Sequence, residues 1–212
     1  MVSVQKDNEH YCGGFLVSHF FVMTAAHCWE KGMELTVVLG AHDLSIKETF
    51  SYRLSVKLYH VYPGFNKTTL KNDIMLLQLP QKAQKSKTVD TIPFARKDKK
   101  VKAGAKCDVA GWGSKKRNGP RAPKLHEADV KVASKKKCQA YRSYDPSVML
   151  CIGGKAGFCK GDSGGPLVCE KEAVGLVSFN EKGNCDKPTI PNVYTKISAF
   201  VPWVEAVIKS VK

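Results

Sequence analysis

Eight cysteines in a chain of 212 residues constrain the fold of this protein more than any other feature of its sequence. No two of them have the short spacing that is typical of paired zinc ligands, which disfavours a zinc module. An even number of cysteines without metal spacing indicates up to four disulfide bonds and an oxidising compartment such as the secretory pathway. Many pairings remain possible, and the spacing alone selects none of them.

The composition is that of a globular protein, with 43% hydrophobic and 25% charged residues, and it excludes disordered, collagen-like and fibrous chains. The longest apolar run, residues 15–26, is interrupted by Ser18 and His19 and is too short to span a bilayer. Residues 1–6 contain neither the basic segment nor the apolar segment of a signal peptide. We therefore expect no membrane span, and we expect any secretion signal to lie upstream.

Short segments with strand character recur between turn signals along the whole chain, a pattern typical of an all-β sandwich or barrel. The expected strands are residues 1–5, 15–22, 35–39, 52–59, 74–79, 106–110, 128–132, 166–168, 174–179 and 193–197. Helical spacing occurs in the tail, residues 198–212, where Ser198 is a candidate N-cap before an apolar stripe.

The net charge of +15 is concentrated in the middle of the chain. Residues 82–137 contain 18 basic and 5 acidic groups, and 29 of the 34 cations in the chain are lysines. One interpretation is a solvated surface, and the other is a patch that binds sulfated glycans or nucleic acids. The chain has no zinc-finger, helix-turn-helix or RNP motif, so nucleic-acid binding is disfavoured.

Ser163 lies among glycines in the segment Gly161–Pro166, where backbone N–H groups can approach a reacting carbonyl closely. All six histidines precede Ser163, which excludes the Ser–acid–His order of α/β-hydrolases. The Asp–His–Ser order of subtilisin-like enzymes would need a base among the later histidines, and nothing around them suggests one. The His–Asp–Ser order remains.

His27 and Asp73 fit that order. His27 lies in the small-residue segment Thr24–Cys28, although a lone histidine in such a segment is more often structural. Asp73 opens the apolar segment 74–77, and a carboxylate that enters a core needs hydrogen bonds or a cation. The imidazole of a catalytic histidine would supply both.

Four motifs in this order and spacing resemble those of the chymotrypsin-like (trypsin-fold, S1) serine proteases, and most of all the granzymes and mast-cell proteases. They are Thr24–Cys28, Asp73–Leu77, Gly111–Gly113 and Gly161–Pro166. The resemblance covers the whole chain. It implies two six-stranded antiparallel Greek-key barrels, in residues 1–90 and 91–212, with a C-terminal α-helix.

The same resemblance implies a role for each site residue. His27 would be general base and then acid, Asp73 would orient it, and Ser163 would be the nucleophile. The N–H groups of Gly161 and Ser163 would form the oxyanion hole, and Ser178 would lie beside the substrate-binding strand. The resemblance also implies the disulfide bonds, which are Cys12–Cys28, Cys107–Cys169, Cys138–Cys151 and Cys159–Cys185.

The residue six positions before the nucleophile lines the floor of the substrate pocket in this family, and a carboxylate there selects Lys or Arg. Here that residue is Gly157, and its neighbours Phe158 and Lys160 supply no acid. The wall positions, often glycine, are Asn180 and Asn192. We therefore expect a short pocket without tryptic specificity, which accepts Met, Leu or a smaller aliphatic residue better than Phe or Tyr.

Activation is expected to involve Asp162, the acid before the nucleophile. In the family a segment that begins Ile-Ile-Gly-Gly or Ile-Val-Gly-Gly precedes the first strand, and its freed amino group pairs with this acid. Residues 1–4 already align with the first strand. We therefore expect the chain to be a fragment or an incomplete gene model with zymogen-like, very low activity.

The expected partners are protein or peptide substrates, macromolecular serine protease inhibitors and, through residues 82–137, sulfated glycosaminoglycans. The sequence has no cofactor motif and no metal-ligand cluster. The expected location is extracellular or a secretory granule, and Asn66 begins one glycosylation sequon. The alternative function is a catalytically silent homologue that binds polyanions, but the three triad residues are intact and favour an enzyme.

Overall fold

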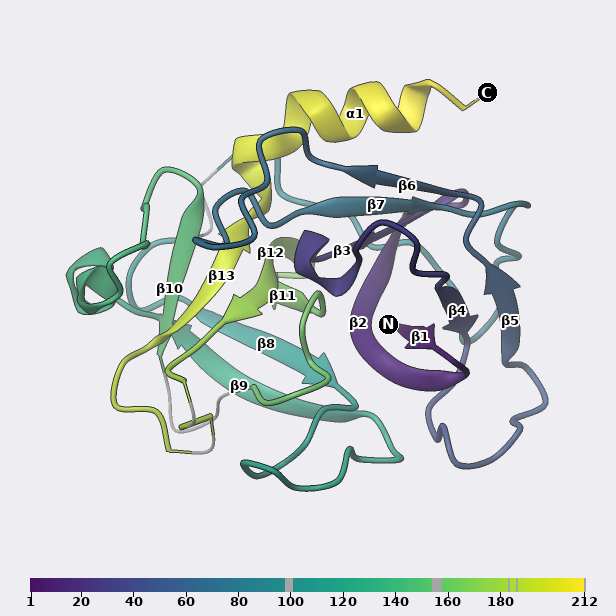
Figure 1. The fold of residues 1–212 in the computed structure, drawn as a ribbon, viewed down its shortest axis with the longest axis horizontal. Coiled ribbons are helices and arrows are strands. Elements are labelled where there is room, and N and C mark those ends of the chain that lie inside the picture. Colours follow the sequence, from purple (N-terminus) through teal and green to yellow (C-terminus); the bar gives the residue numbers. More distant parts are fainter. Residues whose placement is uncertain (98–100, 154–157, 183, 186, 212) are drawn as a thin grey trace.

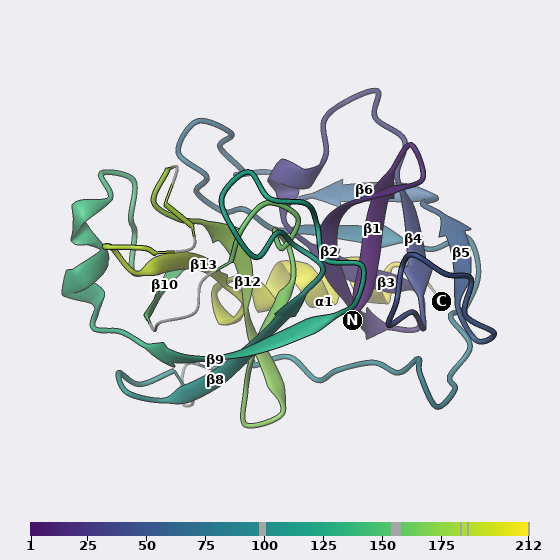
Figure 2. The same ribbon diagram turned by 90° about the horizontal axis from the view of Figure 1, so that it is seen from below.

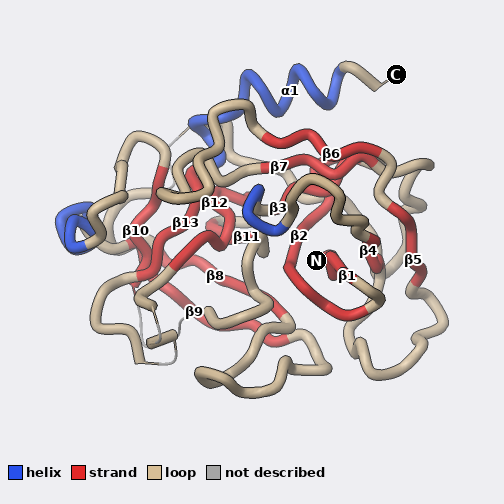
Figure 3. The backbone as a smooth tube through the Cα atoms, in the orientation of Figure 1, coloured by secondary structure: helices blue, strands red, loops and turns tan. Residues whose placement is uncertain are grey.

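A computed structural model describes residues 1–97, 101–153, 158–182, 184–185 and 187–211. Two curled β-sheets lie side by side, and a C-terminal helix packs across the upper edge of the molecule (Figure 1). Strands and loops make up nearly all of the chain (Figure 3). No helix in these ranges is long and apolar enough to cross a membrane.

The first sheet has seven strands in the order β5-β4-β1-β2-β3-β7-β6. Their bounds are β1 Val2–Lys6, β2 Glu9–Ser18, β3 Phe21–Thr24, β4 Thr36–Leu39, β5 Tyr52–Ser55, β6 Leu58–Val61 and β7 Met75–Gln78. The two outermost strands, β5 and β6, are consecutive in the chain and are separated by Val56 and Lys57. One extended segment therefore bends here, pairs first with β4 and then with β7, and curls the sheet into a half-barrel.

The second sheet is a closed barrel in the order β10-β13-β12-β11-β8-β9. Its strands are β8 Lys106–Gly111, β9 His126–Val132, β10 Met149–Gly153, β11 Pro166–Cys169, β12 Glu172–Phe179 and β13 Asn192–Lys196. All its pairings are antiparallel. The expectation of an all-β fold with a C-terminal helix is confirmed, with one closed barrel and one half-barrel of seven strands in place of two six-stranded barrels.

The expected strands differ from the structure at three places. The expected strand 52–59 is divided into β5 and β6. The segment 15–22 contains a turn at residues 19–20, so that it closes the hairpin between β2 and β3. β10 was not expected from the sequence, because its residues are apolar on both faces and the strand begins directly after a loop. An apolar run of this length has no alternation that would distinguish a strand from a buried helical turn.

The helices are short. They are the 3₁₀ helices η1 Ala26–Cys28, η3 Lys135–Ala140 and η4 Ile197–Phe200, and the α-helix α1 Val201–Lys209. The expected N-cap at Ser198 is wrong, because η4 buries Ile197 and Phe200 and the α-helix begins only after Phe200. Pro202 lies in the first turn of α1, where its missing N–H costs no hydrogen bond.

The two sheets are joined by a shared apolar core. Phe15, Phe21 and Met23 from the first sheet contact the same cluster as Leu176 of β12 and Val204 of α1. The helix thus packs over both sheets and fixes their relative position, and the turned view places α1 behind both (Figure 2).

The four disulfide bonds of the described chain are the pairs that the resemblance implied. They are Cys12–Cys28, Cys107–Cys169, Cys138–Cys151 and Cys159–Cys185. The first joins β2 to η1, which carries His27. The third joins η3 to β10, and the fourth joins the loops that precede β11 and β13. Bridging a short loop of this kind is worth about 3 kcal/mol in the chain-entropy account.

Candidate active site

His27 and Asp73 come from neighbouring strands of the first sheet. η1 follows β3 and Asp73 precedes β7, and these two strands pair with Thr24 opposite Met75. The register therefore brings the two side chains together. His27 Nδ1 lies 2.7 Å from Asp73 Oδ2, and the His27 backbone N–H donates to Asp73 Oδ1 at 2.9 Å. This double contact fixes both the position of the ring and its tautomer, with the proton on Nδ1.

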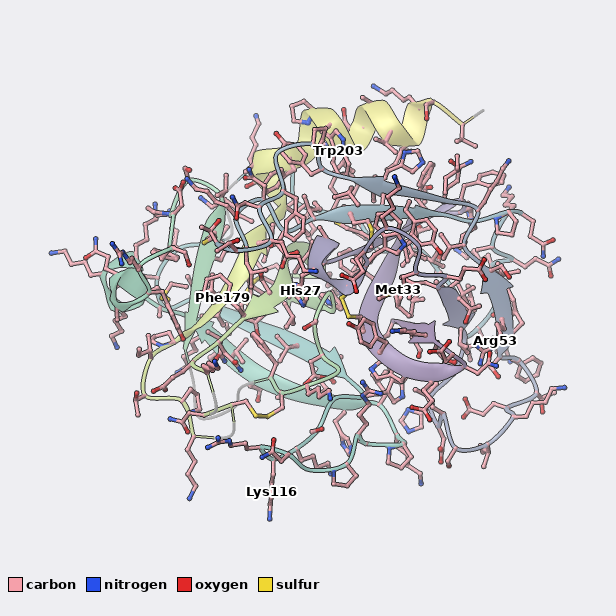
Figure 4. All side chains as sticks on the ribbon, viewed as in Figure 1. His27, Met33, Arg53, Lys116, Phe179 and Trp203 are labelled. Carbon is pink, nitrogen blue, oxygen red and sulfur yellow. A yellow bond between two sulfur atoms is a disulfide. The ribbon has the colours of Figure 1, made fainter. Side chains whose placement is uncertain are left out.

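Asp73 is fully buried and is bound from both sheets. Ser178 of β12 donates its hydroxyl to Asp73 Oδ2 at 2.6 Å, and Thr195 of β13 donates to the Asp73 backbone carbonyl at 2.9 Å. A buried carboxylate needs such donors to remain charged. A donor from the second sheet therefore stabilises the charge of Asp73, which belongs to the first sheet. His27 lies where the two sheets meet (Figure 4).

The pKa of His27 is raised from its usual value. Burial lowers the pKa, but the negative charge of Asp73 and the hydrogen bond from Nδ1 raise it further than burial lowers it. A histidine with this environment takes up a proton readily from a reacting group, since Asp73 stabilises the imidazolium that forms. The ring is thus suited to general base catalysis near neutral pH.

Ser163 lies in the turn that leads into β11, and its backbone is bound to the first sheet. Gly13 donates its N–H to the Ser163 carbonyl at 2.8 Å, and Cys28 Sγ lies 3.8 Å from the same oxygen. The next residue, Gly164, has φ of +79°, and a Cβ there would overlap the Thr24 hydroxyl. The turn therefore requires glycine, and it places Ser163 beside the residue that follows His27.

The loop of the expected oxyanion hole is fixed on both sides of Gly161. Ser114 donates its N–H to the Lys160 carbonyl at 2.9 Å, which orients the peptide that carries the Gly161 N–H. His10 Nε2 lies 2.8 Å from the Gly161 carbonyl and fixes the following peptide. Gly161 has φ of +106°, a conformation that side chains disfavour.

His10 is the inner end of a hydrogen-bond relay that we did not expect from the sequence. Arg53 Nη2 donates to Gln5 at 2.6 Å, Gln5 Nε2 donates to Ser3 at 3.1 Å, and Ser3 Oγ lies 2.8 Å from His10 Nδ1. A carbonyl can only accept, so His10 carries its proton on Nε2, and Ser3 donates to Nδ1. Burial first, with a smaller contribution from the charge of Arg121, lowers the pKa of His10 to about 4, so the ring is neutral.

Asp162 lines a cavity of about 300 Å³. Its carboxylate accepts the N–H of Gly113 at 2.8 Å and that of Cys159 at 3.1 Å. A Cβ at Gly111 or Gly113 would overlap this carboxylate, which explains the two glycines of the Gly-Trp-Gly motif. Desolvation raises the pKa of Asp162 to about 6 although both backbone donors lower it.

The expected pocket residues are described in part, because Gly157 lies outside the described residues. Asn180 Nδ2 donates to the Phe158 carbonyl at 2.6 Å, which draws a wall residue toward the floor segment. The Phe158 ring contacts Tyr194 edge-on at 5.4 Å, and Asn192 is buried in β13. Lys160 is exposed. Within the described ranges, no three His, Cys, Asp or Glu side chains are placed to hold a metal ion.

The profile of the trypsin family matches residues 1–204 of the chain. The chain belongs to the trypsin family of serine proteases. Mast cell protease 3 of Ovis aries is 43% identical over 209 residues, which are 96% of this chain and 80% of that protein. Cathepsin G of Homo sapiens is 38% identical over 207 residues, 95% and 78% of the two chains. Granzyme B of Homo sapiens is 39% identical over 204 residues, 93% and 80% of the two chains.

The family membership that the four motifs indicated is therefore confirmed, and the half-barrel, barrel and helix are those of a trypsin-like fold. Sequence reasoning missed Ser3, Gln5, Arg53 and Thr195, which lie in strands with no local motif. Arg53 and Thr195 bind partners in strands distant in the chain, whereas Ser3 and Gln5 lie in β1 next to His10 of β2. His10 precedes Cys12 by two residues, but nothing in its neighbourhood distinguished it from the other histidines.

Proposed function

We propose that the chain is a serine endopeptidase that cleaves peptide bonds through an acyl-enzyme. Ser163 Oγ attacks the scissile carbonyl while His27 Nε2 takes the hydroxyl proton, and Asp73 stabilises the imidazolium. The oxyanion of the tetrahedral intermediate accepts the N–H groups of Gly161 and Ser163. His27 then protonates the leaving amine, which departs and leaves the acyl group on Ser163. A water molecule, deprotonated by His27, releases the acid in the second half of the reaction.

The observation that carries this proposal is the buried pairing of His27 and Asp73 at 2.7 Å, with Ser178 as a further donor to the carboxylate. A merely structural histidine does not need a charged partner that is held by three donors. A fluorophosphonate probe tests the proposal, because it labels only an activated serine. We expect labelling of the active form and none of the Ser163→Ala variant, and equal labelling of the two would contradict the proposal.

We propose that Asp162 is the acid that receives an activating amino group. Support comes from its raised pKa of about 6 and from the cavity beside it, since a carboxylate with two backbone donors would gain a charged partner there. The test compares the printed chain with one that is processed to begin Ile-Ile-Gly-Gly ahead of Met1. We expect the processed chain to be about a hundredfold to a thousandfold more active, the usual effect of losing an oxyanion donor. Equal rates would refute the role of Asp162.

For the residue before the scissile bond we propose a short apolar side chain. The hydrogen bond from Asn180 to the Phe158 carbonyl supports a narrowed pocket, and the described pocket residues include no acid that would pair with Lys or Arg. Peptide p-nitroanilides that end in Leu, Met, Ala, Phe and Arg separate the alternatives. Dominant cleavage after Arg would overturn this specificity. Macromolecular serine protease inhibitors would enter the same cleft.

A second proposed activity is polyanion binding through residues 82–137, in storage granules or outside the cell. The described lysines of this segment are all exposed, as expected of a surface that attracts sulfated glycans. Four disulfide bonds support an oxidising location. Elution from immobilised heparin above physiological salt is the expected result, and elution below it would contradict the proposal. A silent homologue would bind heparin but would not be labelled by the fluorophosphonate.

A further inference from the structure

The loop between β6 and β7, residues 62–74, has a strained backbone directly before Asp73. Leu70 has φ of +55° and Asn72 has φ of +58°, so that left-handed residues lie on both sides of Lys71. Asparagine adopts this conformation readily, whereas a bulky side chain such as leucine rarely does. Strain of this kind persists only where the surrounding structure holds it, and it is concentrated at functional sites. A contact that holds Lys71 in place would explain how the strain persists.

Lys71 forms an ion pair with a loop of the second half of the molecule. Its Nζ lies 2.7 Å from Oδ2 of Asp145, in the loop before β10, residues 141–148. Figure 1 shows the β6–β7 loop at the end of the first sheet that faces β10. The pair therefore joins the two halves of the molecule at a point two residues before Asp73.

Asp145 is held firmly by its own loop. Its Oδ1 accepts the backbone N–H of Ser147 at 2.9 Å and the hydroxyl of the same residue at 2.6 Å, which leaves Oδ2 for the lysine. Lys196 of β13 donates to the neighbouring Pro146 carbonyl at 2.8 Å and fixes the loop to the barrel. Hydrogen bonds from Lys71 and Ser147 lower the pKa of Asp145 to about 2, so the carboxylate is charged near neutral pH. A carboxylate that is already fixed loses little side-chain entropy when it binds a cation.

The same loop has a second ion pair that differs in exposure and in position. Lys67 Nζ lies 2.8 Å from Glu30, two residues after η1, so this pair stays within the first half of the molecule. Its side chains are 73% and 62% exposed, compared with 47% and 26% for Lys71 and Asp145. Exposed pairs contribute little to stability. Lys67 is therefore a matched control for Lys71.

We propose that the ion pair between Lys71 and Asp145 is a clamp that positions Asp73 for catalysis. Both members are positioning residues, and the inference rests on the proposed endopeptidase function, to which it adds a role for these two side chains. The clamp holds the chain just before Asp73, so that the left-handed turn at Asn72 directs the carboxylate to His27. When the clamp is lost, the turn relaxes and the carboxylate moves away from the ring.

The first test measures the pKa of His27 by NMR titration of its ring in the 212-residue chain, and it needs no turnover. Burial lowers this pKa and the charge of Asp73 raises it, so a carboxylate that moves away lowers it. We expect Lys71→Gln and Asp145→Asn to lower the pKa of His27 by similar amounts. A direct charge effect would have opposite signs, since loss of a cation raises this pKa and loss of an anion lowers it. Shifts of opposite sign, or no shift, would overturn the clamp.

The second test measures p-nitroanilide hydrolysis by the processed enzyme. We expect Lys71→Gln and Asp145→Asn each to lower kcat by roughly threefold to tenfold with little change in KM, because a small displacement of Asp73 misaligns the base. The acid limb of the pH–rate profile should move to lower pH together with the pKa of His27. Lys71→Arg, which keeps the cation, should retain most of the activity, and Lys67→Gln should leave kcat unchanged.

The two tests separate a positioning role from a structural one. If Lys71→Gln lowered the free energy of unfolding but left kcat and the pKa of His27 unchanged, the pair would be structural alone and the inference would be wrong. Equal effects of Lys67→Gln and Lys71→Gln would also overturn it. Absence of hydrolysis by the unmodified processed enzyme would refute the proposed function alone, because the NMR titration still decides whether the clamp positions Asp73.

Discussion

Asp73 and Asp162 are two enclosed aspartates of the candidate active site, and their environments are opposite. Asp73 lies where the sheets meet and accepts the backbone and ring N–H of His27 and the hydroxyl of Ser178. Asp162 lies in the turn before β11, next to the expected oxyanion-hole residues, and accepts two backbone N–H groups. Desolvation raises the pKa of Asp162 to about 6.

The comparison shows how one fold can stabilise the charge of one buried carboxylate and leave the charge of another without enough partners. The donors to Asp73 come from both sheets, so its charge is stabilised as soon as the sheets pack. The donors to Asp162 come from neighbouring loops and leave a cavity beside the carboxylate. The ionised Asp162 carboxylate would attract any cation that can enter the cavity. The proposed activation by an amino group needs this property.

The largest effect is expected for the substitution Asp73→Asn. The amide would keep the shape but would favour the wrong tautomer of His27, so we expect kcat to fall by about 10⁴, as in the template triad of this family. Active-site titration and p-nitroanilide kinetics on the processed enzyme measure the loss. The surface variant Asp43→Asn is the control. A loss below about tenfold would mean that Asp73 does not orient the base.

Asp162→Asn sharpens the comparison through the pH dependence of stability. The folded pKa of about 6 lies above the usual aspartate value of 3.8. The folded state therefore binds the extra proton between these values and loses stability as pH rises through them. In the 212-residue chain, the free energy of unfolding of the variant relative to the parent should therefore rise by about 2 to 3 kcal/mol between pH 3 and pH 7.5. Urea unfolding at both pH values measures this.

The control for Asp162→Asn has the opposite sign. Asp145 forms an ion pair with Lys71 at 2.7 Å, and hydrogen bonds from Lys71 and Ser147 lower its pKa to about 2. The ionised Asp145 carboxylate stabilises the folded state above its unfolded pKa, and this stabilisation is lost as pH falls. Asp145→Asn should therefore lower the free energy of unfolding relative to the parent at pH 7.5. The same sign for both variants would contradict the assigned environments.

Ser178→Ala removes one donor from Asp73 and should have a smaller effect. A hydrogen bond to a buried charge contributes about 1.5 to 3 kcal/mol, so we expect a loss of that size in the free energy of unfolding and a reduced kcat. Ser147→Ala is the matched control, because its hydroxyl donates to the partly exposed Asp145 at 2.6 Å. Equal losses for the two variants would show that burial of Asp73 adds nothing to the bond.

The smallest expected effect concerns the relay behind Gly161. Gln5→Glu keeps an acceptor for Arg53 but removes the donor to Ser3, so the Ser3 hydroxyl would turn from His10 toward the new carboxylate. We expect kcat to fall severalfold with KM unchanged, because the relay positions a donor to the oxyanion. Lys57→Ala, an exposed cation just after β5, is the control. A change in KM alone would contradict the relay.

Local sequence predicts most of the strands and the motifs of the candidate site. The glycines of the segment Gly161–Pro166, the small residues before His27 and the apolar strand after Asp73 each meet a local steric or burial requirement, which is why they can be recognised in isolation. The strands of alternating character were expected for the same reason. The start of α1 and the strand β10 were missed, because neighbouring packing decides them rather than their own residues.

Only the tertiary structure determines which residues bind each other at the candidate site. Ser178 is 105 positions from Asp73, and Gly161 is 151 positions from His10, so no local pattern could link them. Arg121 and Lys116 are equally basic in the sequence, and only packing of their loop beside Gly161 leaves Arg121 half-buried and Lys116 exposed. The sequence determines which groups can react. The fold determines their solvent exposure and their partners, and electrostatic interactions depend on both.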